Sequence, residues 1–367
     1  MSYKDYPSPE TKFYHHALPF TLESGEVLPE LVIAYRTWGS LNALADNAIL
    51  ICHGLTGSAD ADEWWKPLFG EGRAFDTTKD FIVASNVLGG CYGTTGATSL
   101  NPHTGKWYGA TFPHITIRDM VAAQALLIEA LGIKKLKLVI GGSMGGMQVL
   151  EWAVMFPEKV KALCPIAVSG RHSAWCIAIS EAERFAIYAD ARWQNGNYSP
   201  DDPPTAGLAA ARMMAMISYR SKASFDIKFS RAPQSPDSEL FAVESYLRYQ
   251  GKKFIDRFNA NTYITLTKAM DTHDLARGRG DYEQVLRSIQ QPTLVVSIPS
   301  DILYLPEEQA ELARYLPCAE LATLNSPHGH DAFLIDMEQL NEIVVAFLKK
   351  LESGYPIRRC DDDDLAS

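Results

Sequence analysis

The chain has 367 residues and a formal net charge of −10, with 47% hydrophobic and 21% charged residues. This composition is typical of a soluble globular protein. The negative charge argues against a nucleic acid or an anionic membrane as a partner, because neither would be attracted to the protein as a whole. The sequence has no apolar run near the roughly 20 residues that cross a bilayer, and residues 1–7 lack a signal-peptide pattern. We therefore expect a cytoplasmic enzyme.

The first 170 residues alternate between strand-like and helix-like patterns. Helices are predicted at residues 117–131 and 146–156, and the second ends before Pro157. This alternation predicts a mostly parallel sheet with helices on both faces, and residues 1–170 form the first part of an α/β core. The predicted strands are residues 31–35, 48–52, 81–86, 136–140 and 162–168.

Residues 171–290 have a different character, because their patterns are helical and no strand-like run interrupts them. We predict that this segment is a helical lid inserted into the core. The core resumes over residues 291–352, and residues 353–367, with four consecutive aspartates, are expected to form a solvated tail. Helices are predicted at 177–191, 206–219, 238–258, 262–273 and 337–351, and strands at 293–297 and 319–324.

The six cysteines are scattered and contain no C-x-x-C pair. Cys52 and Cys164 lie within apolar runs, where the expected state is a buried, reduced thiol. The cysteines therefore predict neither a disulfide framework nor a metal site.

The run Gly-Gly-Ser-Met-Gly at 141–145 stands between a predicted strand and a predicted helix. Strand, G-x-S-x-G and helix together indicate a nucleophile elbow, a sharp turn that exposes a serine hydroxyl. Such a turn brings backbones so close that glycine is required at the flanks, here Gly141 and Gly145. Ser143 would then be held in a strained conformation at the positive end of the following helix.

A nucleophilic serine needs a base to take its proton and an acid to orient that base. In α/β-hydrolase folds these follow the serine in the order acid, then histidine, on loops after strands. Asp301 directly follows the strand at 293–297, whereas the aspartates of the helical region follow no strand. His328 and His330 both follow the last strand, and position separates them poorly. We favour His330, because it opens the final helical segment.

An oxyanion hole requires two preorganised backbone N–H groups. One is expected from Met144, directly after the nucleophile, and the other from Leu55, on the loop after an early strand. His53 ends that strand and is expected to be structural. No further residue completes a metal-ligand set around His328, His330 and Asp331, so no metal is expected.

The elbow and many other segments resemble the homoserine O-acetyltransferase family, and the likeness extends over nearly the whole chain. The run at 169–176 is more similar to the fungal branch of that family, and Gly54 stands where many bacterial members have alanine. The segments that carry the resemblance are residues 53–57, 86–91, 101–113, 117–121, 141–152, 211–213, 219–221 and 329–334.

The resemblance implies an α/β-hydrolase fold and a ping-pong transferase. Ser143 would take the acetyl group of acetyl-CoA and pass it to the side-chain hydroxyl of L-homoserine, in methionine biosynthesis, with no further cofactor. By the same resemblance Arg212 binds the carboxylate of the amino acid and Asp331 its amino group, as the pairing of guanidinium with carboxylate and of carboxylate with ammonium allows. The resemblance also implies a homodimer built from lid helices.

Several related activities stay open at this point. Relatives in the family use succinyl-CoA as donor, or accept serine or deacetylcephalosporin C. A plain serine esterase or thioesterase would need the catalytic residues but not a clamp for an amino acid.

Overall fold

The computed structural model describes residues 7–354, and its core is an eight-stranded sheet in the order β1-β4-β6-β5-β7-β8-β9-β10. The strands β1 and β4 run antiparallel to their neighbours, and the pairs from β6 to β10 are parallel. This arrangement confirms the predicted fold class. The strand bounds are β1 Lys12–His16, β4 Leu31–Trp38, β5 Ala48–Cys52, β6 Phe81–Ser85, β7 Leu136–Gly142, β8 Leu163–Ile166, β9 Thr293–Ser297 and β10 Ala319–Thr323.

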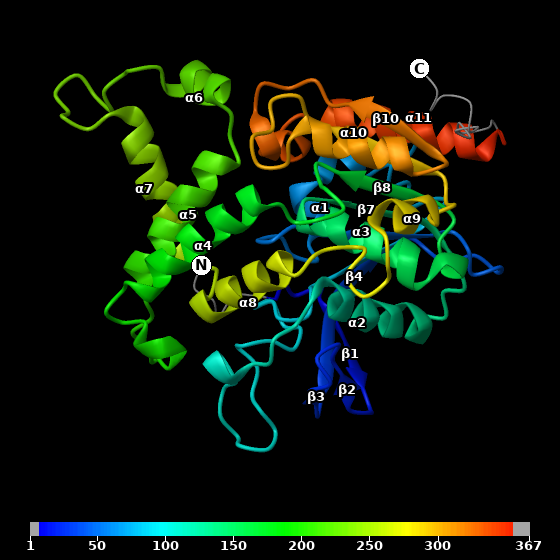
Figure 1. Cartoon of the computed structure of the whole chain (residues 1–367), viewed down its shortest axis with the longest axis horizontal. Coiled ribbons are helices and arrows are strands. Elements are labelled where there is room, and N and C mark those ends of the chain that lie inside the picture. Colours follow the sequence, from blue (N-terminus) through cyan, green and yellow to red (C-terminus); the bar gives the residue numbers. More distant parts are fainter. Residues whose placement is uncertain (1–6, 355–367) are drawn as a thin grey trace.

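The parallel strands are buried on both faces, because alternate side chains enter two separate hydrophobic clusters. On β7, Val139 belongs to one cluster, and its neighbours Leu138 and Ile140 belong to the other. This is the period of two that a strand imposes on its side chains. Helices cover both faces, as predicted (Figure 1).

One face is covered by α2 (Ile117–Ala130), α3 (Met144–Met155) and α10 (Pro306–Tyr315), which contribute to the first cluster. The other is covered by α1 (Ala61–Trp64) and α11 (Met337–Glu352). At the start of α2, Thr116 accepts from the Asp119 N–H and Asp119 accepts from the Thr116 N–H, which satisfies two free donors of the first turn. The short 3₁₀ helices are η2 Lys66–Leu68, η3 Gly109–Thr111, η4 Pro157–Lys159, η5 Gln194–Gly196 and η6 Gly329–Leu334.

The chain between β8 and β9 is helical, and α4, α5, α6, α7 and α8 gather at one side of the sheet (Figure 1). Helix α5 packs against α4 and α7, and α4 packs against α8. Helix α9 instead packs against α10 of the core. The division at residues 171 and 290 stays a prediction. The bounds are α4 Ala174–Tyr188, α5 Thr205–Ser218, α6 Lys222–Phe229, α7 Ala242–Ile255, α8 Ala260–Asp271 and α9 Tyr282–Arg287.

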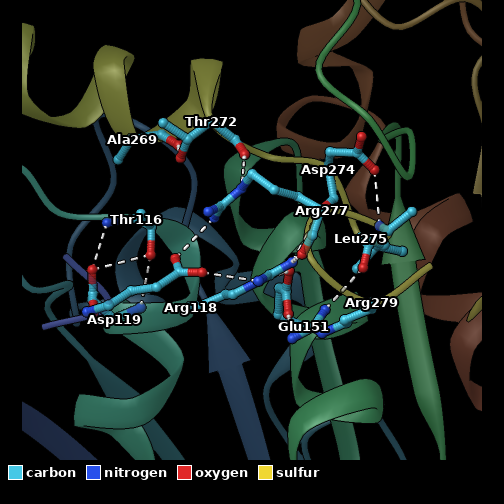
Figure 2. A network of polar contacts seen from close by, with 12 residues as sticks. Thr116, Arg118, Asp119, Glu151, Ala269, Thr272, Asp274, Leu275, Arg277 and Arg279 are labelled. Atoms are coloured by element: carbon cyan, nitrogen blue, oxygen red, sulfur yellow. Dashed lines mark hydrogen bonds and ion pairs between the residues drawn. The ribbon is translucent and has the colours of Figure 1, made fainter. Parts of the chain in front are cut away.

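A buried carboxylate anchors the return of the chain from the helical layer to the core (Figure 2). Glu151 of α3 is 1% exposed, and it pairs with Arg118 of α2 at 3.1 Å and with Arg279 at 2.7 Å. Arg118 also donates to the backbone carbonyls of Asp274 and Arg277. A buried carboxylate is tolerated only when it is paired in this way. The network therefore holds the returning segment against α2 and α3.

Several elements lie outside the predicted set: β1, the hairpin of β2 (Phe20–Thr21) and β3 (Val27–Leu28), and the helices α1, α6, α9 and α10. They are short, so their apolar residues show little periodicity in the sequence. Cys52 and Cys164 are buried and unpaired, as expected. Among residues 7–354, no helix is long and apolar enough to span a bilayer. The four aspartates of the tail lie outside the described residues.

Candidate active site

Ser143 stands at the turn between β7 and α3 with φ 58° and ψ −127°, a conformation rare for a residue with a side chain. The glycines around it permit this turn. A Cβ on Gly145 would lie 2.1 Å from the carbonyl oxygen of Cys52, and one on Gly141 would lie 2.5 Å from the same atom. Any other residue would clash with backbone at either place. The steric reason predicted for the two glycines is therefore confirmed.

A pocket of about 400 Å³ opens over Ser143, at the carboxyl ends of β5 and β7 and below residues of the helical layer. Ligands of open α/β sheets bind at this edge. The pocket brings together five of the seven predicted site residues. The other two are Asp301, which bonds His330, and Met144, which follows Ser143 in the chain. The pocket lining includes His53, Gly54, Leu55, Thr56, Trp64, Ser143, Arg212, Tyr219, Arg257, His330, Asp331 and Phe333.

Asp301 and His330 are 29 residues apart, and the Nδ1–H of His330 donates to Oδ2 of Asp301 at 2.7 Å. The other carboxylate oxygen accepts the backbone N–H groups of Leu303 and Tyr304 at 2.8 and 3.1 Å. Both residues are almost fully buried, at 2% and 3% exposure. The carboxylate is thus fixed by the backbone, and it orients the imidazole.

Two opposing effects act on the pKa of His330. Burial disfavours the imidazolium and lowers the pKa, but the charges of Asp301 and Asp331 and the hydrogen bond that His330 donates to Asp301 outweigh it. The resulting pKa is raised above the ordinary histidine value. His330 is therefore a stronger base than a free imidazole, which suits it to accept a proton from a hydroxyl.

The second ring nitrogen of His330 has no hydrogen-bond partner in the part of the chain that the structure describes. Nε2 is buried and has no hydrogen-bond partner within residues 7–354, so it does not bond the hydroxyl of Ser143 in this structure. Both residues line the same pocket. Catalytic hydrogen bonds of this kind often tighten only in the substrate complex. The catalytic roles of Ser143, Asp301 and His330 stay predictions.

The loop after β5 lies against the elbow. A Cβ on Gly54 would be 3.6 Å from the carbonyl oxygen of Gly142 and 3.9 Å from Cβ of Ser143. The next residue is Leu55, which lines the pocket. Met144 is the first residue of α3, so its N–H has no acceptor within the helix. The positions of Leu55 and Met144 suit an oxyanion hole, and that role stays a prediction.

His53 belongs to the scaffold of this loop. Its Nδ1 bonds the carbonyl oxygen of Gly54 at 2.7 Å, and its Nε2 accepts the backbone N–H of Val87 at 3.1 Å. Burial lowers its pKa to about 4, so the ring is neutral near pH 7. His53 is structural, as the sequence suggested.

Arg212 and Asp331 both line the pocket, but their partners differ. The guanidinium of Arg212 lies 5.1 Å from the ring centre of Phe254 and 5.6 Å from that of Tyr219, and its Nη1 is buried without a hydrogen-bond partner within the described chain. Asp331 forms an ion pair with Arg220 at 3.2 Å. Burial raises the pKa of Asp331, and the charges of Arg220 and Arg212 oppose that effect.

Sequence reasoning assigned no role to several residues that the structure places at the site: Tyr219, Arg220, Arg257 and Tyr304. The ring of Tyr304 lies 5.3 Å from that of His330, and its hydroxyl bonds Nδ1 of His172 at 3.0 Å. The sequence analysis assigned no role to His172 either. The resembling run at 219–221 was the signal available for Arg220. No pattern pointed to Arg257.

The remaining candidates lie elsewhere. Nδ1 of His328 bonds the hydroxyl of Ser224 on α6 at 3.1 Å, so this histidine joins the core to the helical layer and does not contact Asp301. Asp271, a weaker candidate for the acid, pairs with Arg184 at 2.7 Å. Within residues 7–354, no cluster of three or more His, Cys, Asp or Glu side chains is suited to a metal ion.

Comparisons with known proteins agree with the fold. The family model described as "alpha/beta hydrolase fold" matches residues 47–336. A homoserine O-acetyltransferase of Nostoc punctiforme is 63% identical over 349 residues, which cover 94% of this chain and 98% of that protein.

Two solved structures are also similar. The homoserine O-acetyltransferase of Bacillus anthracis superimposes with a TM-score of 0.86 at 26% identity, covering 96% of this chain and 100% of that one. Esterase E22 gives a TM-score of 0.84 at 30% identity, covering 92% and 99%. The local resemblance to fungal members stays a prediction. The near-complete coverage at high identity shows that the chain belongs to the homoserine O-acetyltransferase family of the α/β-hydrolase fold.

Proposed function

We propose that this protein transfers an acetyl group from acetyl-CoA to the side-chain hydroxyl of L-homoserine through an acyl-enzyme on Ser143. In the first half-reaction His330 takes the hydroxyl proton of Ser143, the serine oxygen attacks the thioester carbonyl, and the C–S bond breaks. His330 returns the proton to the departing thiolate. The N–H groups of Leu55 and Met144 would stabilise the negative oxygen of each tetrahedral intermediate.

The second half-reaction repeats these steps with a different nucleophile. His330 takes the proton of the homoserine hydroxyl, whose oxygen attacks the acetyl-enzyme. The bond to Ser143 breaks, and the proton passes from His330 to the serine oxygen. The hydrogen bond from His330 to Asp301 at 2.7 Å supports the same base in both halves.

Arg212 is the observation that favours a transferase over an esterase. It is a cation at the pocket with a buried Nη1 that no protein group satisfies within residues 7–354. An unsatisfied buried donor is costly, and more so on a charged group. A carboxylate from the acceptor would satisfy it, preferably in a bidentate pair. An esterase acting on apolar esters gains nothing from such a group.

Asp331 supports an acceptor that carries an ammonium group as well. One of its oxygens pairs with Arg220, which holds the carboxyl group at the pocket and opposes the rise in its pKa that burial causes. Arg212 and Asp331 thus present opposite charges at one pocket. An α-amino acid, with its carboxylate and ammonium on the same carbon, has the complementary charges.

The experiment is to acetylate the enzyme with acetyl-CoA, remove the donor, and chase separately with homoserine, serine, deacetylcephalosporin C and water. We expect an added acetyl mass on the peptide that contains Ser143, and fastest discharge by homoserine. A parallel loading with succinyl-CoA tests the donor. An acetyl group found on a cysteine would contradict the proposed acyl-serine intermediate. Discharge by water as fast as discharge by homoserine would favour an esterase.

Arg212→Ala tests the clamp within the same experiment. Removing one partner of a buried charge pair costs about 2–5 kcal/mol, so transfer to homoserine should slow roughly 30- to 5,000-fold. Loading from acetyl-CoA should change far less, because the donor carries no carboxylate at that place. Equal losses of rate in the two half-reactions would contradict the assignment of Arg212 to the carboxylate of the acceptor. Arg248→Gln, on the exposed side of α7, is the matched control.

We also propose a homodimer formed through the helical layer. Large apolar side chains are exposed on three of its helices: Phe185 on α4, Ile217 on α5 and Tyr249 on α7, at 66%, 51% and 60% exposure. Burying such side chains between two copies would be favourable. A monomeric mass by light scattering would contradict this proposal.

The cytoplasmic location stays a prediction from the sequence, which cell fractionation tests.

A further inference from the structure

Arg257 joins the helical layer to the loop that carries Leu55. It lies just after α7, and its Nη1 donates to the carbonyl oxygen of Thr56 at 2.9 Å and to the hydroxyl of Tyr92 at 2.7 Å. The guanidinium also lies 5.3 Å from the ring centre of Phe254. These contacts cross 201 and 165 residues of sequence. Arg257 therefore ties the end of a lid helix to two segments of the core.

The loop that it contacts is a tight turn over residues 54–57. The N–H of Gly57 donates to the carbonyl oxygen of Gly54 at 3.0 Å, and Nδ1 of His53 bonds the same oxygen at 2.7 Å. That carbonyl shares a planar peptide unit with the N–H of Leu55. The two bonds to the oxygen therefore set the direction of the N–H that would form the oxyanion hole.

The other end of the turn has a different kind of support. Its carbonyl at Thr56 is held by Arg257, which belongs to the helical layer, whereas Gly54 is held by groups of the loop itself. A turn that is held at its Gly54 end only is free to pivot about that end, and the Leu55 N–H would move with it. An oxyanion donor must lie within a few tenths of an ångström of its place, because a hydrogen bond weakens steeply with misalignment.

We propose that Arg257 is a positioning residue that holds the 54–57 turn, and with it the Leu55 N–H, in the geometry that stabilises the oxyanion. The inference rests on the proposed acyl-serine chemistry and on the proposed role of Leu55. Arg257 acts through the loop and exchanges no proton with the substrate. It makes the oxyanion hole depend on the docking of the α7 end against the core.

The test compares Arg257→Gln, Arg257→Lys and the control Arg248→Gln as full-length enzymes. Each is acylated by acetyl-CoA and by p-nitrophenyl acetate, which has neither a CoA moiety nor an amino-acid part, and active sites are titrated by the acyl burst. We expect Arg257→Gln to slow acylation by both donors equally, roughly 10- to 100-fold, which is less than the loss of a whole oxyanion donor. The acetyl-CoA concentration that gives half-maximal acylation should stay within about twofold of the wild-type value, since no ground-state contact to the donor is lost.

Arg257→Lys should recover a large part of the loss, because both hydrogen bonds come from one nitrogen that an ammonium can replace. A loss confined to acetyl-CoA would overturn the proposal and make Arg257 a contact of the donor. So would a fall in titratable sites with a normal rate per remaining site, which a merely structural role predicts. If the wild type failed to acetylate homoserine while Arg257→Gln slowed both donors, the proposed acceptor would fall and this inference would stand.

Discussion

Asp301→Asn should disable the enzyme because it changes which ring nitrogen of His330 carries the proton. One oxygen of Asp301 accepts two backbone N–H groups, from Leu303 and Tyr304, and the other accepts the Nδ1–H of His330. Asparagine has a single oxygen, and the two fixed backbone donors claim it. Its NH₂ group then faces His330, so Nδ1 must become an acceptor. The proton moves to Nε2, and the ring can no longer take a proton from Ser143.

The size of the loss follows from the burial of this pair. Restoring the working tautomer would set two N–H donors against each other in a place where both residues are at most 3% exposed. Each buried unsatisfied donor costs about 1–3 kcal/mol, which is about 2–6 kcal/mol for two. At 1.36 kcal/mol per tenfold this slows acylation by roughly 30- to 30,000-fold. The carboxylate charge that stabilises the imidazolium is also lost. We therefore expect a loss in the upper part of this range, roughly 10³- to 10⁴-fold.

Single-turnover acylation by acetyl-CoA, followed by the loss of thioester absorbance, measures this directly. Glu308→Gln is the control, because it removes a carboxyl that acts on the α10 terminus and does not contact His330. We expect the control to stay within about threefold, since it leaves the histidine tautomer unchanged. An Asp301→Asn enzyme that acylates within tenfold of the wild type would refute the tautomer argument.

Two further predictions concern the elbow and the base. Gly145→Ala should destabilise the fold by about 3 kcal/mol or more, because its Cβ would lie 2.1 Å from the Cys52 carbonyl oxygen, whereas Gly54→Ala makes only ordinary contacts and should leave the midpoint of thermal unfolding nearly unchanged. Similar midpoints for both variants would contradict the steric account. Asp331→Asn removes a negative charge that raises the pKa of His330, so the acidic limb of acylation by p-nitrophenyl acetate should shift to lower pH. A shift to higher pH would show that His330 is not the titrating base.

The elbow could be recognised in the sequence because its physical requirements are local. A strand, two glycines that avoid a clash, a serine and a helix are all contained within about 20 residues, and the structure places them as β7, the 141–145 turn and α3. The parallel core could be predicted for the same reason, since strands buried on both faces are nearly continuous apolar runs. Helix α2, with its Thr116 and Asp119 pair, also carries its own start signal.

Other features depended on contacts between distant segments, which no local pattern encodes. The sequence left His328 and His330 nearly equivalent, and only the packed loops show which of them contacts Asp301. Arg220 and Arg257 gain their partners, Asp331 and Thr56, across more than a hundred residues. Periodicity determines which face of a helix is apolar, but the tertiary fold decides what that face meets. Local sterics therefore determined the nucleophile turn, and long-range packing decided the surroundings of the pocket.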